Sequence, residues 1–193
     1  NDYAVYQQAF CLGLRKNYAE KASLLQSFEK RFPKSDYLNK AIFEEARAFV
    51  SLKQTDQAIA AFQRLMKHAP NSDLARKSGI QIGLLYYQNG KSSQAIAAYK
   101  KVIADYPGSQ EAQTAINDLK SIYVATNQVN DYVQYVAGLG DGFALQAGEQ
   151  DSLSYLAAER LMMDNKKDEA IAAYQLYLTQ FPQGAFYTPA NYH

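Results

Sequence analysis

The chain has 193 residues and carries 20 Lys and Arg against 19 Asp and Glu, which gives a formal net charge of +1. This balance argues against a protein that coats nucleic acid or a membrane surface, because both need a surplus of basic side chains. With 48% hydrophobic residues the chain can bury a core, but its single Cys cannot form an internal disulfide, and its short apolar runs fall far below the ~20 residues that span a bilayer.

Four of the five prolines recur at a fixed period. Pro33, Pro70 and Pro107 lie 37 residues apart, and Pro182 lies 75 residues further on, which is two periods plus one residue. A fixed period of a few tens of residues is typical of a solenoid. We therefore divide the chain into units at 1–33, 34–70, 71–107, 108–144 and 145–182, followed by a tail at 183–193.

Two amphipathic helices are clearest in the unit at 71–107. Apolar residues recur at helical spacing over 74–88, and Asn89-Gly90 then provides a stop and a turn. A second helix is predicted over 92–105, with Ser72 and Ser92 as the N-caps of the two helices and Pro107 ending the unit. No stretch alternates with period two, so we expect an all-α chain.

These residues resemble the tetratricopeptide repeat family, whose pattern is Trp, Leu-Gly and Tyr on the first helix, then Ala, Phe and Pro around the second. At those places the three best-matched units carry Ile42, Glu45-Ala46, Phe49, Ala58, Phe62 and Pro70; Gly79, Ile82-Gly83, Tyr86, Ala95, Tyr99 and Pro107; and Ser154, Ala157-Ala158, Leu161, Ala170, Tyr174 and Pro182. The resemblance implies a right-handed α-α superhelical solenoid of about five helix-turn-helix repeats.

Two units match this pattern less well. In the first unit, Lys21 stands where a small residue is expected; in the fourth, Lys120, Tyr132 and Val136 take the Gly, Ala and Phe places. The Gly-rich turn over 138–150 carries the one-residue slip, and we expect a local irregularity there. Because none of the five units has Trp at the Trp place, we also expect looser packing of the first helices than the family pattern implies.

Catalytic and metal-binding residues are sparse. Cys11 lies at an apolar helical place and we expect it to pack in the core or at the groove edge, since His68 and His193 offer it no nearby base. One Cys and two distant His make no usual zinc site. His68 is interpreted as a helix C-terminal or surface residue. We therefore predict no catalytic residue, no metal and no cofactor.

The acidic pairs and the Gly-rich run have simpler explanations than chemistry. Glu44-Glu45 and Asp168-Glu169 are adjacent on helices, where neighbours point about 100° apart, so solvated faces and helix N-terminal charges explain them better than a catalytic pair. Glu45 is unusual because it takes a Leu place. Gly138-x-Gly140-x-Gly142 follows no predicted strand and is interpreted as a turn and not as a phosphate-binding loop.

The groove is the remaining candidate site. In the repeat family the first helices line the concave face, and the resemblance places the inward side chains at Tyr3, Tyr6, Phe10, Lys40, Phe43, Arg47, Lys77, Ile80, Leu84, Tyr87, Asn117, Ser121, Tyr155 and Glu159. Aromatic side chains interleaved with Lys and Arg are typical of protein-binding surfaces. The alternative is that several of them pack within the chain. These places depart from the Lys and Asn clamp with which some family members bind acidic C-termini, so we expect a peptide with apolar anchors.

We predict a non-catalytic scaffold that binds a protein or peptide in the groove, with no nucleic acid partner and no membrane insertion by this chain. The alternatives are an architectural spacer or homo-oligomer that docks through Phe186 and Tyr187, and a recruiting module for an enzyme or membrane assembly. The absence of an initial Met and the aromatic tail suggest a piece of a longer array. The FP-x-S and YP-x-S junctions resemble bacterial cell-envelope repeats of the Tol–Pal and outer-membrane assembly type, which implies a Gram-negative periplasm, with the cytoplasm as the alternative.

Overall fold

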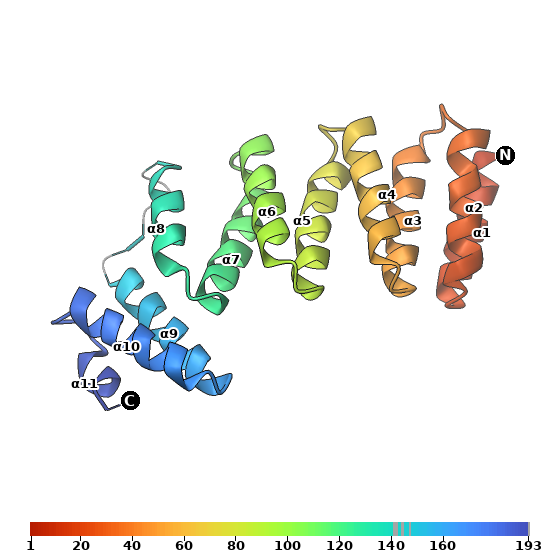
Figure 1. Cartoon of the computed structure of the whole chain (residues 1–193). Coiled ribbons are helices and arrows are strands. Elements are labelled where there is room, and N and C mark those ends of the chain that lie inside the picture. Colours follow the sequence, from red (N-terminus) through yellow and green to blue (C-terminus); the bar gives the residue numbers. More distant parts are fainter. Residues whose placement is uncertain (141–142, 144, 147, 193) are drawn as a thin grey trace. The chain divides into compact units, whose positions relative to one another are not determined.

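The computed structural model describes residues 1–140, 143, 145–146 and 148–192, and within these ranges the chain forms eleven helices and no strand (Figure 1). The helices are α1 Asp2–Leu14, α2 Tyr18–Arg31, α3 Leu38–Ser51, α4 Thr55–His68, α5 Asp73–Gln88, α6 Ser92–Asp105, α7 Gln110–Ala125, α8 Val129–Ala137, α9 Glu149–Met163, α10 Lys167–Gln180 and α11 Tyr187–Ala190. The chain divides into two compact units, Asn1–Ile116 and Asn117–His193. Each unit is described by itself below.

The turns that join helices in pairs repeat the period of the sequence. Each has a middle residue with positive φ, and these residues are Lys16, Lys53, Gly90, Asn127 and Asn165. They lie 37, 37, 37 and 38 residues apart, so the extra residue falls between Asn127 and Asn165. The predicted irregular turn at 138–150 lies in this interval, although its residues 141, 142, 144 and 147, and with them Gly142 of the Gly-x-Gly run, are outside the described part of the chain.

A shared backbone hydrogen bond closes these turns. In each, the amide after the positive-φ residue donates to a carbonyl five residues back, as from Asn17 to Leu12 at 2.9 Å and from Gln54 to Phe49 at 2.9 Å. This is the Schellman arrangement, which satisfies carbonyls that a helix end would otherwise leave without a partner. Four of the five positive-φ residues are not Gly. The backbone conformation of the turns therefore repeats with the same period as the prolines.

The predicted helix bounds in the unit at 71–107 are confirmed to within one residue, but one predicted cap is wrong. Ser72 is the N-cap of α5, and its side chain accepts a hydrogen bond from the Ala75 amide. Ser92, in contrast, is already the first residue of α6, and Lys91 precedes it without any side-chain cap. The intervening turn is closed by backbone bonds, so no side-chain cap is needed there.

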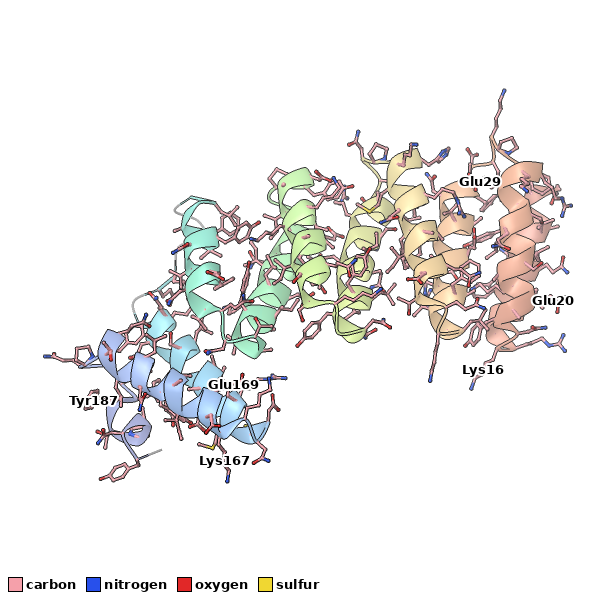
Figure 2. All side chains as sticks on the ribbon, in the orientation of Figure 1. Lys16, Glu20, Glu29, Lys167, Glu169 and Tyr187 are labelled. Carbon is pink, nitrogen blue, oxygen red and sulfur yellow. The ribbon has the colours of Figure 1, made fainter. Side chains whose placement is uncertain are left out.

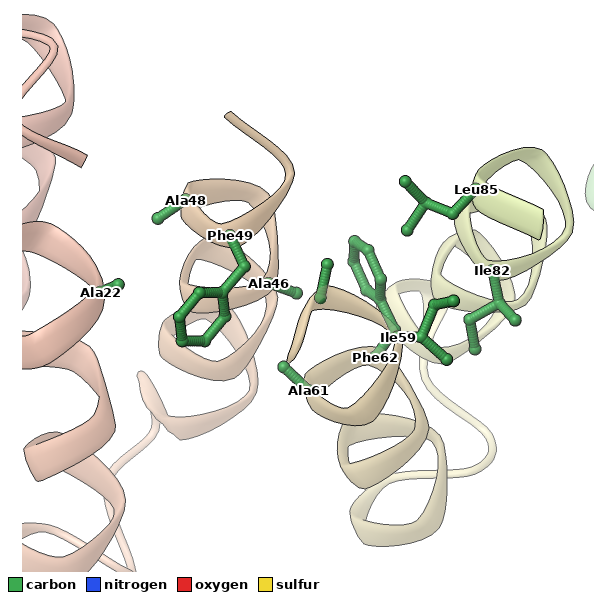
Figure 3. Packing of buried hydrophobic residues seen from close by; sticks show 10 residues of the cluster. Ala22, Ala46, Ala48, Phe49, Ile59, Ala61, Phe62, Ile82 and Leu85 are labelled. Carbon is green, nitrogen blue, oxygen red and sulfur yellow. The ribbon is translucent and has the colours of Figure 1, made fainter. Parts of the chain in front are cut away.

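The core of the first unit lies where consecutive helices meet. Each helix from α1 to α6 contacts the next, and Figure 1 shows them standing side by side. Figure 3 shows one buried cluster to which α2, α3, α4 and α5 all contribute, including Phe49 and Phe62. Ala46 and Ala58, at the small-residue places of the repeat pattern, are fully buried in the same cluster. Small side chains at these places let the paired helices approach closely.

The place where the family pattern has Trp is closely packed in two repeats. Gly79 is buried, and a Cβ added to it would lie 2.5 Å from Val102 Cγ2. Ile42, which takes the same place in the preceding repeat, is only 1% exposed. A surface pocket of 310 Å³, lined by Met66 and Tyr86 among others, lies beside Gly79. The expected looser packing of the first helices is therefore not found at these two places.

The second unit is held together by buried tyrosines. Tyr174 and Tyr177 of α10 are fully buried in a cluster with Ala158, Leu161 and the Ala190 side chain of α11. Tyr132 and Val136, which depart from the repeat pattern on the short helix α8, are also buried. Burial, together with the charge of Glu149, raises the pKa of Tyr132 to about 12. The departures from the pattern are thus accommodated in a packed core.

Candidate functional site

The residues that most often carry chemistry are dispersed. Cys11 is exposed on α1, so of the two predicted places, the core and the groove edge, the core is wrong. His68 is exposed in the last turn of α4, as predicted. Among the described residues, no group of three or more His, Cys, Asp or Glu side chains is arranged to hold a metal ion. In the same part of the chain, no helix has the length and hydropathy needed to cross a bilayer.

The two acidic pairs differ from each other. Asp168 and Glu169 lie exposed in the first turn of α10, as predicted, and Figure 2 labels Glu169 there. Glu44 and Glu45, in contrast, lie in the middle of α3 and are not on a solvated face. Each is paired with a different cation, so these two carboxylates form separate ion-pair sites.

Glu44 lies between two cations. Its carboxylate accepts from Lys21 Nζ at 2.5 Å and from Arg47 Nη1 at 2.8 Å. Burial alone would raise the pKa of Glu44, but the hydrogen bond and charge of Lys21, reinforced by Arg47, lower it below its ordinary value. Lys21 is itself buried, and its ammonium lies 3.1 Å from where a Cβ on Gly13 would be. The unexpected Lys of the first repeat is therefore neutralised by the next repeat.

Glu45 is buried more completely, at 1% exposure. Arg64 Nη2 of α4 donates to its carboxylate at 2.6 Å, and Arg64 Nε lies 3.0 Å from Glu29 of α2. Burial raises the pKa of Glu45 above its ordinary value, although Arg64 opposes the shift. Arg64 thus links α2, α3 and α4, and the Glu45 position contributes to the packing of neighbouring repeats.

The predicted groove residues divide between the two units, and none of the fourteen is buried. In the first unit, the exposed members are Tyr3, Phe10, Lys40, Arg47 and Lys77, and the half-buried members are Tyr6, Phe43, Ile80, Leu84 and Tyr87. Lys40 and Lys77 form no salt bridge with any residue in the described ranges. The first helices α1, α3 and α5 therefore present aromatic, aliphatic and cationic side chains that a partner can reach.

Tyr37 joins this surface although the sequence prediction omits it. Its ring stacks on Tyr6 at a centroid distance of 5.3 Å, lies 5.6 Å from the Tyr3 ring, and is 5.8 Å from Lys40 Nζ. Tyr37 precedes α3 and lies three residues before Lys40, a spacing that shares one helical face. That spacing was the available signal.

A surface pocket of 240 Å³ between α1 and α3 brings two predicted residues together. Phe10 and Arg47 both line it, along with Leu14, Lys21 and Glu44. Leu14 is a second residue that the prediction omits, and it is 70% exposed. The signal for Leu14 was its place four residues after Phe10 on the same face of α1.

Phe43 is less free than its neighbours. Its ring meets Phe62 edge-on at 5.5 Å, and it packs against both buried clusters of the first unit. The alternative that some inward residues pack within the chain therefore applies to Phe43. A substitution there would alter the core as well as the surface.

The four predicted residues of the second unit fall into two kinds. Asn117 and Ser121 are exposed on α7, and Ser121 Oγ donates to the Asn117 carbonyl. Tyr155 stacks on Phe186 at 4.6 Å, and Glu159 accepts a hydrogen bond from Tyr174. Burial, followed by the effect of Glu159, raises the pKa of Tyr155 to about 12. Tyr155 and Glu159 thus contribute to internal packing.

A pocket of the second unit contains none of these residues. It has a volume of 640 Å³ and is lined by Val136, Leu145, Asp151 and Phe181 among others. Its acidic residue already has partners: Asp151 accepts from the Tyr177 hydroxyl and from the Ala185 amide at 2.8 Å. The Asp151 carboxylate therefore holds the segment after Pro182 in place.

The family model described as Tetratricopeptide repeat matches residues 3–35, 40–72, 80–109 and 151–184. The first repeat is thus matched despite Lys21, whereas residues 110–150 are not covered. A comparison with curated protein sequences gives no match.

Solved structures share the fold at low sequence identity. A tetratricopeptide repeat protein from Parabacteroides merdae ATCC 43184 has a TM-score of 0.59 at 9% identity, covering 98% of this chain and 70% of its own. BtubC (BKLC) from P. vanneervenii has 0.54 at 13%, covering 90% and 76%. The TPR-like repeats of a putative kinesin light chain from Podosopora anserina have 0.52 at 16%, covering 93% of both chains. The predicted all-helical repeat fold is confirmed.

Proposed function

Because the chain belongs to the tetratricopeptide repeat family, we propose that it is a non-catalytic scaffold that binds a protein or peptide through the first helices of its first unit. The observation that carries this proposal is the accessibility of the predicted contact residues. All ten in that unit can be reached by solvent, although the same helices bury their other faces. Packing of the helices against one another does not require the exposed side chains of Tyr3, Phe10 and Lys77.

The chemistry of the surface favours a peptide with apolar anchors. Tyr3, Tyr6 and Tyr37 form a group of rings, and Ile80, Leu84 and Tyr87 add an aliphatic and aromatic face on α5. Aromatic anchors supply most of the binding energy in protein interfaces, and exposed cations at the rim add specificity. The near-zero net charge of the chain also suits a protein partner better than nucleic acid.

A peptide-display selection against the whole chain tests this proposal. Selected peptides should lose affinity by about tenfold or more when Tyr87→Ala or Lys77→Ala is introduced, because each truncation removes a contact worth on the order of 1.4 kcal/mol. Tyr187→Ala and Lys167→Ala, at exposed positions in the second unit, are the matched controls. Peptides whose affinity responds to the controls and not to Tyr87 or Lys77 would contradict the assignment.

An architectural role through the C-terminal face is a second candidate, favoured by two exposed rings. Tyr187 is 40% exposed and Tyr192 is 84% exposed, whereas Phe186 is occupied by its stacking on Tyr155. Self-association through this face should therefore depend on Tyr187 and Tyr192 and less on Phe186. Sedimentation velocity of the wild type and of Tyr187→Ser/Tyr192→Ser distinguishes a dimer from a monomer.

For location we propose the periplasm or cell envelope of a Gram-negative bacterium, with the cytoplasm as the alternative. The support is the resemblance of the FP-x-S and YP-x-S junctions around Pro33 and Pro107 to those of cell-envelope repeat proteins. Fractionation of the native host with an antibody against this chain tests it. Sequencing the parent gene would show whether the repeats recruit substrates for an enzymatic or membrane domain.

A further inference from the structure

Helix α1 carries an exposed seam, which we define as Tyr3, Gln7, Phe10 and Leu14. Tyr3, Phe10 and Leu14 are 50%, 51% and 70% exposed, and Gln7 is half-buried. The intervals of four, three and four residues are those at which two helices pack along a heptad seam. The buried residues Ala9 and Leu12 occupy a different face of α1, towards the core. The seam therefore has the pattern of a helix–helix interface without its second helix.

The side of the seam that faces α3 carries excess positive charge. Phe10 and Leu14 form part of the 240 Å³ pocket whose lining also contains Lys21, Glu44 and Arg47. Glu44 is shared between the two cations, so these lining residues have a net charge of +1. Lys21 is buried and its charge is neutralised by Glu44, so the excess charge is carried by Arg47, whose side chain is 62% exposed. The Arg47 guanidinium is thus available for one further carboxylate.

We propose that the α1 seam binds an acidic amphipathic helix of a partner protein. The helix lays apolar side chains on Phe10 and Leu14 and directs an Asp or Glu towards Arg47. Gln7, a polar residue within the seam, fixes the register of the pairing. This inference rests on the proposed function, because Tyr3, Phe10 and Arg47 belong to the same first-helix surface.

The charge also selects between possible occupants. A second copy of this chain would bring its own exposed Arg47 and the same excess positive charge, which opposes pairing. The seam itself offers no acidic side chain, since its flanking residues Ala4, Tyr6, Cys11 and Gly13 are uncharged. An acidic partner helix satisfies both the spacing and the charge, whereas a basic helix or a second copy satisfies only the spacing.

Binding of a stapled helical peptide to the whole chain tests the proposal. The probe carries Leu at a and d places and Glu beside them, and its affinity is measured by fluorescence anisotropy. Replacing Glu by Gln in the probe should weaken binding about tenfold, the effect of one charge-assisted hydrogen bond, and replacing it by Lys should abolish binding. A version with a central Pro, which cannot form a helix, should not bind.

Variants of the chain complete the test. Leu14→Gln and Arg47→Glu should each weaken the acidic probe about tenfold or more, and Arg47→Glu should gain affinity for the Lys version of the probe. Leu176→Gln and Lys167→Glu, on exposed positions of α10, are matched controls that should change nothing. Circular dichroism of each variant checks that the helices are retained.

Absence of saturable binding by the acidic probe, or equal affinity for the Gln and Pro versions, would overturn the inference. An affinity for the acidic probe that Leu14→Gln and Arg47→Glu leave unchanged would also overturn the inference. If display-selected peptides still depend on Lys77 and Tyr87 while the acidic helix does not bind, the proposed function stands and only the α1 seam assignment fails.

Discussion

The ring of Tyr99 lies directly against the backbone of Gly83, so that a Cβ on this Gly would be 2.6 Å from the ring carbons Cε1 and Cζ. Tyr99 is 1% exposed and cannot swing into solvent without opening the core. The contact joins α5 to α6 at the place where the repeat pattern requires its smallest residue. It therefore explains in steric terms why Gly or Ala recurs there.

Gly83→Ala is expected to destabilise the first unit. The gain in helix propensity, up to about 1 kcal/mol, is outweighed by overpacking of about 1–3 kcal/mol against Tyr99. The measurement is urea unfolding followed by circular dichroism. Gly83→Ala combined with Tyr99→Leu should recover part of the loss, because the smaller side chain removes the ring. A stability of Gly83→Ala equal to or above wild type would contradict the contact.

Arg64→Ala is expected to be much more damaging than Glu45→Gln. Without Arg64, the Glu45 carboxylate is left buried and unpaired, which costs on the order of 3 kcal/mol. Glu45→Gln removes the buried charge and leaves Arg64 its contact with Glu29, so its effect should stay within about 1 kcal/mol. Chemical unfolding of both variants at neutral pH provides the comparison, and equal losses would show that Glu45 is not buried as described.

Glu45 should also give the unfolding free energy a specific pH dependence. Because burial raises the pKa of Glu45 in the native state, the native chain binds this proton more readily than the unfolded chain. The contribution of Glu45 to stability is therefore fully present below its ordinary pKa of 4.5 and is lost as the pH rises through the raised value. Unfolding curves at a series of pH values should show this slope in the wild type and a flatter profile in Glu45→Gln. Identical profiles would count against the raised pKa.

Tyr177→Phe is expected to loosen the segment after Pro182. The Tyr177 hydroxyl donates to Asp151 and accepts from the Phe186 amide at 3.0 Å, so its removal leaves a buried carboxylate and an amide with fewer partners. The loss should be about 1–3 kcal/mol. Faster hydrogen exchange at the Ala185 and Phe186 amides is the direct readout, with the exposed Tyr192→Phe as a control that leaves these amides unchanged.

Cys11 should react rapidly with thiol reagents in the native chain, since it is exposed on α1. Mass spectrometry after brief treatment with a maleimide measures this, with the unfolded chain as the reference. Native modification within a few fold of the unfolded rate is expected. Complete protection would show that the thiol is buried and would support packing of Cys11 in the core.

The repeat period, the helix bounds and the small-residue contacts were predictable because they depend on local spacing. Pro33, Pro70 and Pro107 fix the phase from which Ala46 and Gly83 follow, and Pro182, after the one-residue slip, fixes the phase of Ala158. The Glu44 and Glu45 ion pairs were not predictable, because Lys21 and Arg64 come from neighbouring helices. No local sequence pattern indicates that these two side chains point towards Glu44 and Glu45. Cys11 was predicted to pack in the core or at the groove edge because it lies between apolar residues, yet Cys11 and its neighbour Phe10 are both exposed.

Parts of the candidate surface were missed for the same reason. Tyr37 is the N-cap residue of α3, just outside that helix, and the register of inward places did not include it. Leu14 is the last residue of α1 and was not among the predicted inward places, although it is 70% exposed. Tyr155 occupies an inward place by register but is covered by Phe186 from the tail, a contact that the repeat pattern does not contain.

Chemical-shift mapping of a display-selected peptide on the isotope-labelled chain tests the central claim most directly. The account predicts that perturbed amides and side chains concentrate on α1, α3 and α5 of the first unit, around Lys40, Lys77 and Tyr87. It also predicts that α2, α4 and α6 stay close to their free shifts. Perturbations confined to the second helices, or to the second unit alone, would contradict the claim that the first-helix surface binds the partner.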